Sequence, residues 1–227
     1  MKLLAKSDPE VTIESHIEDA LKLIPELKES FQRILNVVDE DKFWKSLKYS
    51  IIFHDLGKSH AEFQKLLIGK QNEWHQQRHE LFSLPFIAAS NLPEKEEIYY
   101  TVAGHHKDFD NLLKKLQQYG IHGVDSGLDL NIVTKKNLTF EENFKKNIPV
   151  EEISKILQDY SITINKINEI KISNKIYHFK SKQFRSIKEI LLLILLCGSF
   201  KQCDHLASAG IKSLKKLQIA DFNFLHD

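Results

Sequence analysis

The chain has 227 residues, of which 42% are apolar, and its formal net charge is +1. This length and apolar content are enough to bury a substantial core, so we expect a single domain over residues 1–227. A charge this close to zero excludes a polycation. Any nucleic-acid binding must therefore come from a local basic patch.

The cysteines and apolar runs predict a cytoplasmic protein without a membrane partner. Cys197 and Cys203 form no CxxC pair, and we expect reduced thiols. The first residues contain an apolar run too short for a signal peptide. The longest apolar run, Ile190 to Cys197, is far below the roughly 20 residues needed to span a bilayer. It predicts a fully buried helix.

Helical periodicity dominates the first 120 residues. Thr12 or Ser15 is expected to cap the first helix, which Pro25 should kink or split. Asp39 or Asp41 is the expected cap of the second. Further helices should break near Pro93 and end around Gly104 and Gly120. The expected helical segments are 12–35, 39–58, 61–70, 78–92, 95–106 and 109–120.

The pattern weakens between Gly120 and Pro149, where we expect a loop. Residues 150–162 are again helical in pattern, and residues 162–179 are β-branched, as in a short hairpin or a frayed helix. A buried helix is expected over 187–200. The predicted fold class is all-α, a helical bundle with a small β-hairpin or loop insertion between about 121 and 186.

The stretch SIIFHDLGKSH, residues 50–60, ends an apolar run with chemically active side chains. If it is helical, His54, Asp55 and Lys58 share one face, because residues three and four apart are neighbours. The same stretch also fits an ordinary helix end, since Gly57 is a helix-stopping residue.

Eleven histidines are many for this length, and several lie at helix ends beside acidic residues. In helical bundles, metal sites are built from inward side chains of facing helices. Five histidines and two aspartates exceed the needs of one ion, so we expect two ions bridged by Asp55. The candidate ligands are His16, His54, Asp55, His79, His105, His106 and Asp204.

Adjacent histidines restrict where this site can lie. Consecutive helix residues diverge by about 100°, so His105 and His106 can reach one site only at a helix end, which Gly104 would loosen. Each candidate also has a structural explanation as a cap, a solvated residue or a packed core histidine. We treat the remaining histidines as non-ligands: His60, His75, His122, His178 and His205.

Imidazole and carboxylate ligands favour Mn, Fe, Co or Ni, with Mg as a further candidate. Two divalent ions and two aspartates leave a net positive centre that attracts an anion. Paired metals suit in-line phosphoryl displacement, and Lys58 would stabilise charge on a phosphate oxygen or leaving group. Asp55 and Lys58 are therefore the predicted catalytic residues of a phosphoester hydrolase.

The order of these residues resembles the HD superfamily of metal-dependent phosphohydrolases. It is most similar to the HD nuclease domain of the CRISPR-associated helicase-nuclease of type I systems. The stretches that carry the resemblance are LLAKS with His16 following, FHDLGKSHAEFQ, HELFSLPF, VAGHHKDF and CDHLAS, spanning residues 3 to about 210.

The resemblance implies a ligand set, a substrate and partners. His16, His54, Asp55 and Asp204 would hold one metal ion, and Asp55, His79, His105 and His106 the second. The substrate would be single-stranded DNA, and the partners a CRISPR helicase and its type I effector complex. The chain contains no GxxxxGK[ST] loop, so the helicase would be separate or fused beyond this sequence.

Residues 166–188 hold seven Lys or Arg against one Glu, interleaved with aromatic side chains. This composition suits single-stranded nucleic acid, although it also fits a solvated basic face. The predicted nucleic-acid contacts are Lys107, Lys175, Lys180, Lys182 and Arg185.

Two other functions share this pattern. An HD phosphohydrolase acting on small nucleotides would use every ligand named above, but in a closed pocket instead of an open cleft. A non-catalytic interaction module could also keep the fold, but the complete ligand set argues against it.

Overall fold

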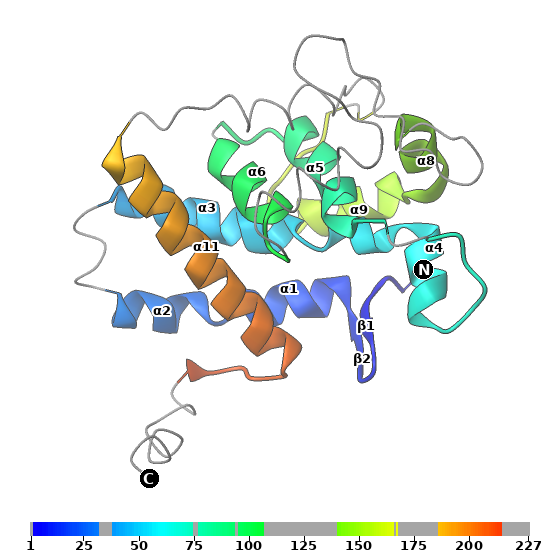
Figure 1. Ribbon diagram of the computed structural model, residues 1–227, viewed down its shortest axis with the longest axis horizontal. Helices are drawn as coiled ribbons and strands as arrows, with labels where there is room; N and C mark the ends of the chain where they lie inside the picture. The colour runs from blue at the N-terminus through cyan, green and yellow to red at the C-terminus, as the bar shows by residue number, and fades with distance from the viewer. Residues whose placement is uncertain are drawn as a thin grey trace.

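The computed structural model describes residues 2–31, 38–74, 77–93, 95–106, 140–165, 167 and 186–214. Within these ranges the chain is mostly helical, which confirms the all-α prediction (Figure 1). The expected helix over 109–120 lies outside the described residues, as do residues 121–139 and 168–185.

The described part of the chain is built from one hairpin followed by helices. The elements are β1 (Leu4–Ser7), β2 (Glu10–Thr12), α1 (Ile13–Leu21), α2 (Ile24–Ser30), α3 (Glu40–Phe53), the 3-10 helix η2 (Leu56–Ser59), α4 (Ala61–Leu67), α5 (His79–Ala89), α6 (Glu96–Ala103), α8 (Phe140–Asn147), α9 (Val150–Gln158) and α11 (Ile187–Ser208).

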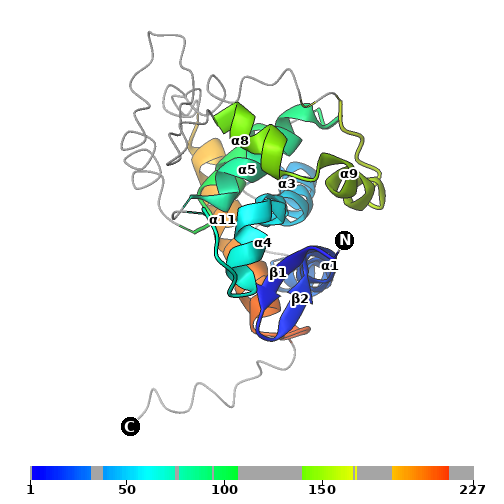
Figure 2. The ribbon, with the colours of Figure 1, turned by 90° about the vertical axis from the view of Figure 1, so that its right-hand side faces the viewer.

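The β-hairpin lies at the N-terminus, where the sequence did not predict it. β1 and β2 pair antiparallel, with Leu4 opposite Thr12 and Ser7 opposite Glu10. Figure 2 shows this hairpin below α4, and the Gln64 side chain of α4 bonds the backbone N–H and carbonyl of Leu4 at 2.9 and 2.8 Å. In the range expected to hold strands, the described residues form only one isolated bridge, between Ile164 and Ser90.

Local capping explains where the first helices begin and end. The Thr12 side chain accepts a hydrogen bond from the Ser15 backbone N–H at 3.0 Å, which confirms Thr12 as the cap of α1. The expected split occurs before Pro25, which lies in the first turn of α2, where its missing N–H costs nothing. Asp39 caps α3 in the same way, accepting from Lys42 at 2.9 Å.

The helix expected over 39–58 is interrupted. α3 ends at Phe53, with His54 as its C-cap, and a 3-10 helix follows at Leu56–Ser59. Gly57 lies against the start of α5, where its N–H donates to the Ser83 hydroxyl at 2.8 Å. This close packing ends the helix two residues before Asp55, so Asp55 lies at a bend.

α11 is one continuous helix, but it is not fully buried as its apolar sequence predicted. Ile187 and Ile194 are 77% and 62% exposed, whereas Leu196 and Phe200 are fully buried. Ser186 caps the helix by accepting from the Glu189 N–H. The helix is long and apolar enough to cross a membrane, which is weak evidence because core helices meet the same criterion.

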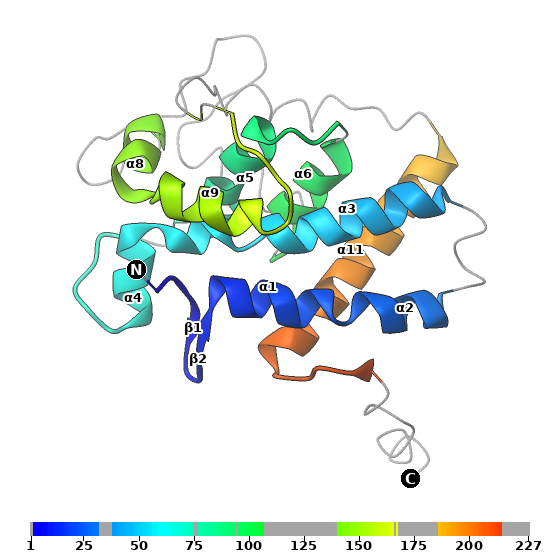
Figure 3. The same cartoon turned by 180° about the vertical axis from the view of Figure 1, so that it is seen from behind.

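The helices surround a single hydrophobic cluster that includes residues of α1, α3, α5, α6, α8, α9 and α11. Figures 1 and 3 show α1 beside α3, with α11 crossing both. α6 packs against α3 and α5. The end of α3, the start of α5 and the end of α6 thereby meet close to the point where α11 crosses α1.

A short charged helix replaces part of the expected loop before Pro149. α8 runs from Phe140 to Asn147, and its Phe140 and Phe144 are both buried. The Phe140 ring stacks on Phe82 of α5 at 4.7 Å between centroids. Two aromatic residues one turn apart thus dock α8 on α5, and the buried Asn143 between them adds hydrogen bonds to His60 and Gln77.

Candidate metal centre

Asp55 is the central residue of the site. It is 1% exposed, and its two carboxylate oxygens face different histidines. Oδ1 lies 3.2 Å from His79 Nε2, and Oδ2 lies 3.3 Å from His54 Nε2 and 3.6 Å from His16 Nε2. Its position in the bend after α3 lets one side chain serve two groups of ligands.

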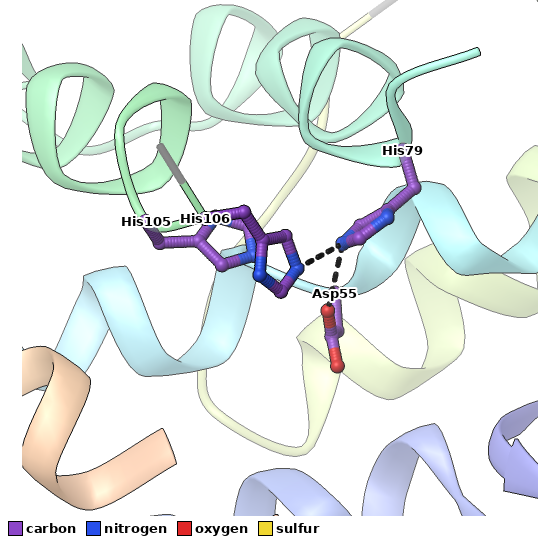
Figure 4. A group of neighbouring side chains, drawn as sticks. All are labelled: Asp55, His79, His105 and His106. Atoms are coloured by element: carbon purple, nitrogen blue, oxygen red, sulfur yellow. Dashed lines mark hydrogen bonds and ion pairs between the residues drawn. The ribbon is translucent and has the colours of Figure 1, made fainter. Parts of the chain in front are cut away.

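The first group consists of Asp55, His79, His105 and His106, shown in Figure 4. One potential ligand atom from each lies within 4.8 Å of the others. His79 begins α5, and its Nε2 lies 3.1 Å from His106 Nε2. α6 ends at Ala103 with Gly104 as its cap, so both adjacent histidines turn toward the same site, as the sequence predicted.

The second group consists of His16, His54 and Asp55, whose ligand atoms also lie within 4.8 Å of one another. Asp204 of α11 joins them, because its Oδ1 lies 3.1 Å from His16 Nε2 and 3.6 Å from His54 Nε2. All seven predicted ligands are thus brought together. The buried group of His and Asp side chains can hold a metal ion.

Backbone carbonyls fix the orientation of two of the rings. His54 Nδ1 lies 2.7 Å from the Ile51 carbonyl, and His105 Nδ1 lies 2.6 Å from that of Val102. A ring nitrogen that donates to a carbonyl leaves the other nitrogen as a metal ligand. His105 Nε2 is buried and has no hydrogen-bond partner among the described residues, as expected of a side chain oriented for a ligand.

The charges of the site keep its two carboxylates deprotonated. Burial opposes ionisation of Asp55, but His54 and Lys58 hold the pKa of its carboxyl well below the usual value. The pKa of the Asp204 carboxyl is lowered in the same way, because burial would raise it but the contacts with His16 and His54 have the larger effect. Both carboxylates are therefore charged, the form that a metal requires.

The histidines divide into two classes. Burial and the neighbouring His106 hold the pKa of His105 well below normal. Burial and the nearby His79 lower the pKa of His106 to about 4. For His54, burial is outweighed by Asp55 and Asp204, which raise its pKa to about 10. At neutral pH His54 therefore carries a second ring proton, which the charges of the two carboxylates stabilise, and a cation that enters the second group displaces this proton.

Lys58 places a cation at the edge of the centre. Its Nζ lies 2.7 Å from Asp55 Oδ2, and its side chain is 17% exposed. His106 is also partly open to solvent, whereas Asp55 and His54 are each only 1% exposed. A ligand from solvent therefore reaches the centre on the side of Lys58 and His106.

Behind His79 lies a buried ion pair that the sequence pattern did not predict. The Arg78 guanidinium donates to Glu80 Oε1 from both Nε and a terminal nitrogen, and Glu80 Oε2 lies 3.7 Å from His79 Nδ1. Burial opposes the Glu80 charge, but His79 and Arg78 lower the pKa of this carboxyl to about 2. At 3.7 Å the Glu80 carboxylate acts on His79 through its charge and not through a hydrogen bond. The sequence does contain a sign of this ion pair, because His79 is flanked by a basic and an acidic residue at the start of a largely apolar segment.

The other histidines that the structure describes lie outside this group of side chains. His60 is fully buried and bonds Asn143 and the Glu62 N–H, away from the seven ligands. His205 is exposed on α11. His75, His122 and His178 lie outside the described residues, and so do the predicted nucleic-acid contacts Lys107, Lys175, Lys180, Lys182 and Arg185.

No family model, no curated protein and no solved structure matches this chain. The candidate site therefore stands on the chain's own geometry: seven candidate ligands, six of them buried, from α1, α5, α11, the end of α3 and the turn after α6, gathered around Asp55.

Proposed function

We propose that the chain is a metal-dependent hydrolase that cuts phosphodiester bonds of single-stranded DNA, with two divalent ions bridged by Asp55. The observation that supports this most directly is the sharing of Asp55 between two ligand groups, one on each carboxylate oxygen. His105 Nε2, buried without a hydrogen-bond partner in the described chain, also fits a ligand role.

The charge balance favours an anionic substrate. Two divalent ions bring four positive charges, and Asp55 and Asp204 return two negative ones. Glu80 is neutralised by Arg78 and does not change this sum. A centre with residual positive charge and partial burial attracts a phosphodiester more strongly than a neutral ester.

The metal ions, Asp55 and Lys58 would have different roles in hydrolysis. Bound divalent ions supply Lewis acidity at phosphorus and a lowered pKa for water, and Mn, Fe, Co or Ni suit these ligands best, with Mg as an alternative. Asp55, held between the two histidine groups, fixes their spacing. Lys58 lies at the open side and can contact a non-bridging oxygen or the departing oxygen.

The substrate and partners rest on the sequence resemblance. The similarity to the HD nuclease domain of the CRISPR helicase-nuclease supports single-stranded DNA as the substrate. It also supports a CRISPR helicase and its effector complex as partners, whereas the cytoplasmic location rests on Cys197 and Cys203, which form no CxxC pair. The basic and aromatic composition of 166–188 supports the same substrate.

The test uses metal-stripped protein and circular single-stranded DNA, with Mn²⁺, Co²⁺, Ni²⁺ or Mg²⁺ added back in turn. We expect cutting that depends on the metal and is lost in Asp55→Ala, with circular dichroism confirming that the variant is folded. His205→Ala is the matched control, because it removes an exposed imidazole next to Asp204 in sequence.

Full activity in folded Asp55→Ala would contradict the site assignment. If the wild-type protein cuts neither circular nor linear strands with any of the metals, but releases phosphate from free nucleotides, the small-nucleotide hydrolase takes the place of the nuclease.

A further inference from the structure

A polar pocket of about 500 Å³ lies beside the metal centre, between α4, α8 and the segment that leads into α5. This volume falls within the range of small-molecule sites in proteins. None of its lining residues is one of the seven metal ligands. Half of them carry side-chain amides: Gln71, Asn72, Gln77, Asn143 and Asn147.

Two connections place the pocket next to the centre. Gln77 lines the pocket two residues before the ligand His79. On α4, the Phe63 ring lies 5.5 Å from the His79 ring, and the adjacent residue Glu62 lines the pocket. The pocket therefore adjoins the centre on its His79 side.

A buried histidine fixes how the amides point. His60 Nδ1 accepts a hydrogen bond from the Glu62 N–H at 3.2 Å, so the ring proton is on Nε2. Nε2 then donates to Asn143 Oδ1 at 3.1 Å. Burial lowers the pKa of His60 to about 4, so the ring is neutral at ordinary pH and keeps this tautomer.

The hydrogen bonds of Asn143 in turn fix the orientation of two neighbouring amides. Asn143 Nδ2 donates to Gln77 Oε1 at 2.8 Å, and Asn147 Nδ2 donates to Asn143 Oδ1 at 2.7 Å. Gln77 is left with its NH₂ as a donor, of which one hydrogen forms a long 3.5 Å contact to the Glu73 carbonyl. Asn147 is left with its carbonyl as an acceptor. The pocket wall therefore offers one fixed donor and one fixed acceptor.

One cation of the pocket is available to a ligand. Lys65 forms an ion pair with Glu62 at 2.8 Å. The other carboxylate oxygen of Glu62 accepts a hydrogen bond from the Glu73 N–H at 2.7 Å. Lys146 is exposed on α8 and makes no ion pair within the described ranges. The site thus combines an amide wall with one free ammonium group.

We propose that this pocket binds one unpaired nucleotide of the strand that the metal centre cuts, with the base against Gln77 and Asn147 and a phosphate beside Lys146. The inference rests on the proposed nuclease function. Unpaired bases expose adjacent donors and acceptors on their pairing edges, which a duplex hides. The pocket would thereby select single strands.

The test measures binding by fluorescence anisotropy, using the metal-free full chain and labelled strands of about 12 nucleotides. One strand is oligo-dA, and the other is an abasic strand with the same phosphates. Free dAMP serves as a competitor. The variants are Lys146→Gln and Gln77→Met, and the matched control is Lys145→Gln, the adjacent lysine that does not line the pocket.

We expect Lys146→Gln to weaken binding of both strands and to reduce the slope of log K against log salt by about 0.7, the loss of one phosphate contact. Gln77→Met should weaken oligo-dA binding roughly tenfold and leave the abasic strand unchanged, because only a base can use the amide donor. Lys145→Gln should have less than a twofold effect.

Equal binding of oligo-dA by Lys146→Gln and the wild-type protein would overturn the assignment; Lys146 is exposed, so this variant should fold. Binding of dAMP as tight as that of the strand would also overturn it. Hydrolysis of bis(4-nitrophenyl) phosphate with Mn²⁺ tests the metal centre separately, because this diester is too small to need the pocket. If the wild-type protein does not hydrolyse this diester, the result would contradict the proposed nuclease function but not the proposed nucleotide binding in the pocket.

Discussion

Gly57 sets the distance between two parts of the metal centre. A Cβ at this position would lie 1.9 Å from the His79 carbonyl oxygen and 3.0 Å from Phe82 Cβ. The Ser83 hydroxyl, which accepts from the Gly57 N–H, donates to the His54 carbonyl at 2.8 Å. The bend that carries Asp55 can approach His79 because residue 57 has no side chain.

Gly57→Ala should therefore destabilise the protein by about 1–3 kcal/mol and weaken Mn²⁺ binding, since α5 must move away from Asp55. Urea unfolding and titration calorimetry measure the two effects. Gly198→Ala is the control: its Cβ would meet no atom within 4 Å, and it should stabilise α11 by about 0.5–1 kcal/mol. Wild-type stability in Gly57→Ala would contradict the close approach.

At the scale of elements, α11 has two different faces. Leu196 is fully buried, whereas Ile194, two residues earlier, is 62% exposed. We expect Leu196→Ala to lower the free energy of unfolding by about 2–5 kcal/mol and Ile194→Lys to change it by less than about 0.5 kcal/mol. Chemical denaturation of both variants measures the difference. A large loss in Ile194→Lys would show that this face is covered in solution.

The sequence predicted which histidines and aspartates lie together because they carry chemistry that few other residues share. Histidines and aspartates at helix ends can be listed without knowing the fold, and α1, α5, α6 and α11 bring the listed residues to one point. The end of α3 at Phe53 was harder to predict. Its apolar pattern continues to Leu56, and the interruption depends on packing against α5, which lies far along the sequence.

Other features depend on contacts that no local pattern contains. The strands of the hairpin are four and three residues long, too short for a clear alternation. α8 is held on α5 partly by the stacking of Phe140 on Phe82. The amide wall requires His60, Gln77 and Asn143 to meet from three separate segments. Such pairings appear only once tertiary structure is known.

At the scale of the whole molecule, the centre links elements from both ends of the chain. His16 lies on α1 and Asp204 on α11, 188 positions apart, and their side chains are 3.1 Å from each other. Since the unfolded chain cannot hold these ligands together, a metal that binds them binds the folded state alone. Metal binding should therefore raise the thermal stability of the entire fold.

A free metal concentration about 100 times the dissociation constant stabilises a folded protein by about 2.7 kcal/mol, or roughly 5–10 °C in Tm for a chain of this size. We expect this shift on adding Mn²⁺ to metal-free protein, as measured by calorimetry, and its reversal by a chelator. Asp204→Asn should reduce the shift, because it removes a charge from the second ligand group alone, while His205→Ala should keep it.

The same pair of variants tests whether the centre holds two ions. Elemental analysis of metal-loaded protein should give two equivalents of metal in His205→Ala. In Asp204→Asn, occupancy should fall toward one, because Asp55, His79, His105 and His106 remain intact as the first group. A single equivalent in both proteins would mean that Asp55 serves one ion. The positive charge of the centre would then come from that ion and Lys58, and in-line attack between paired metals would no longer explain the site.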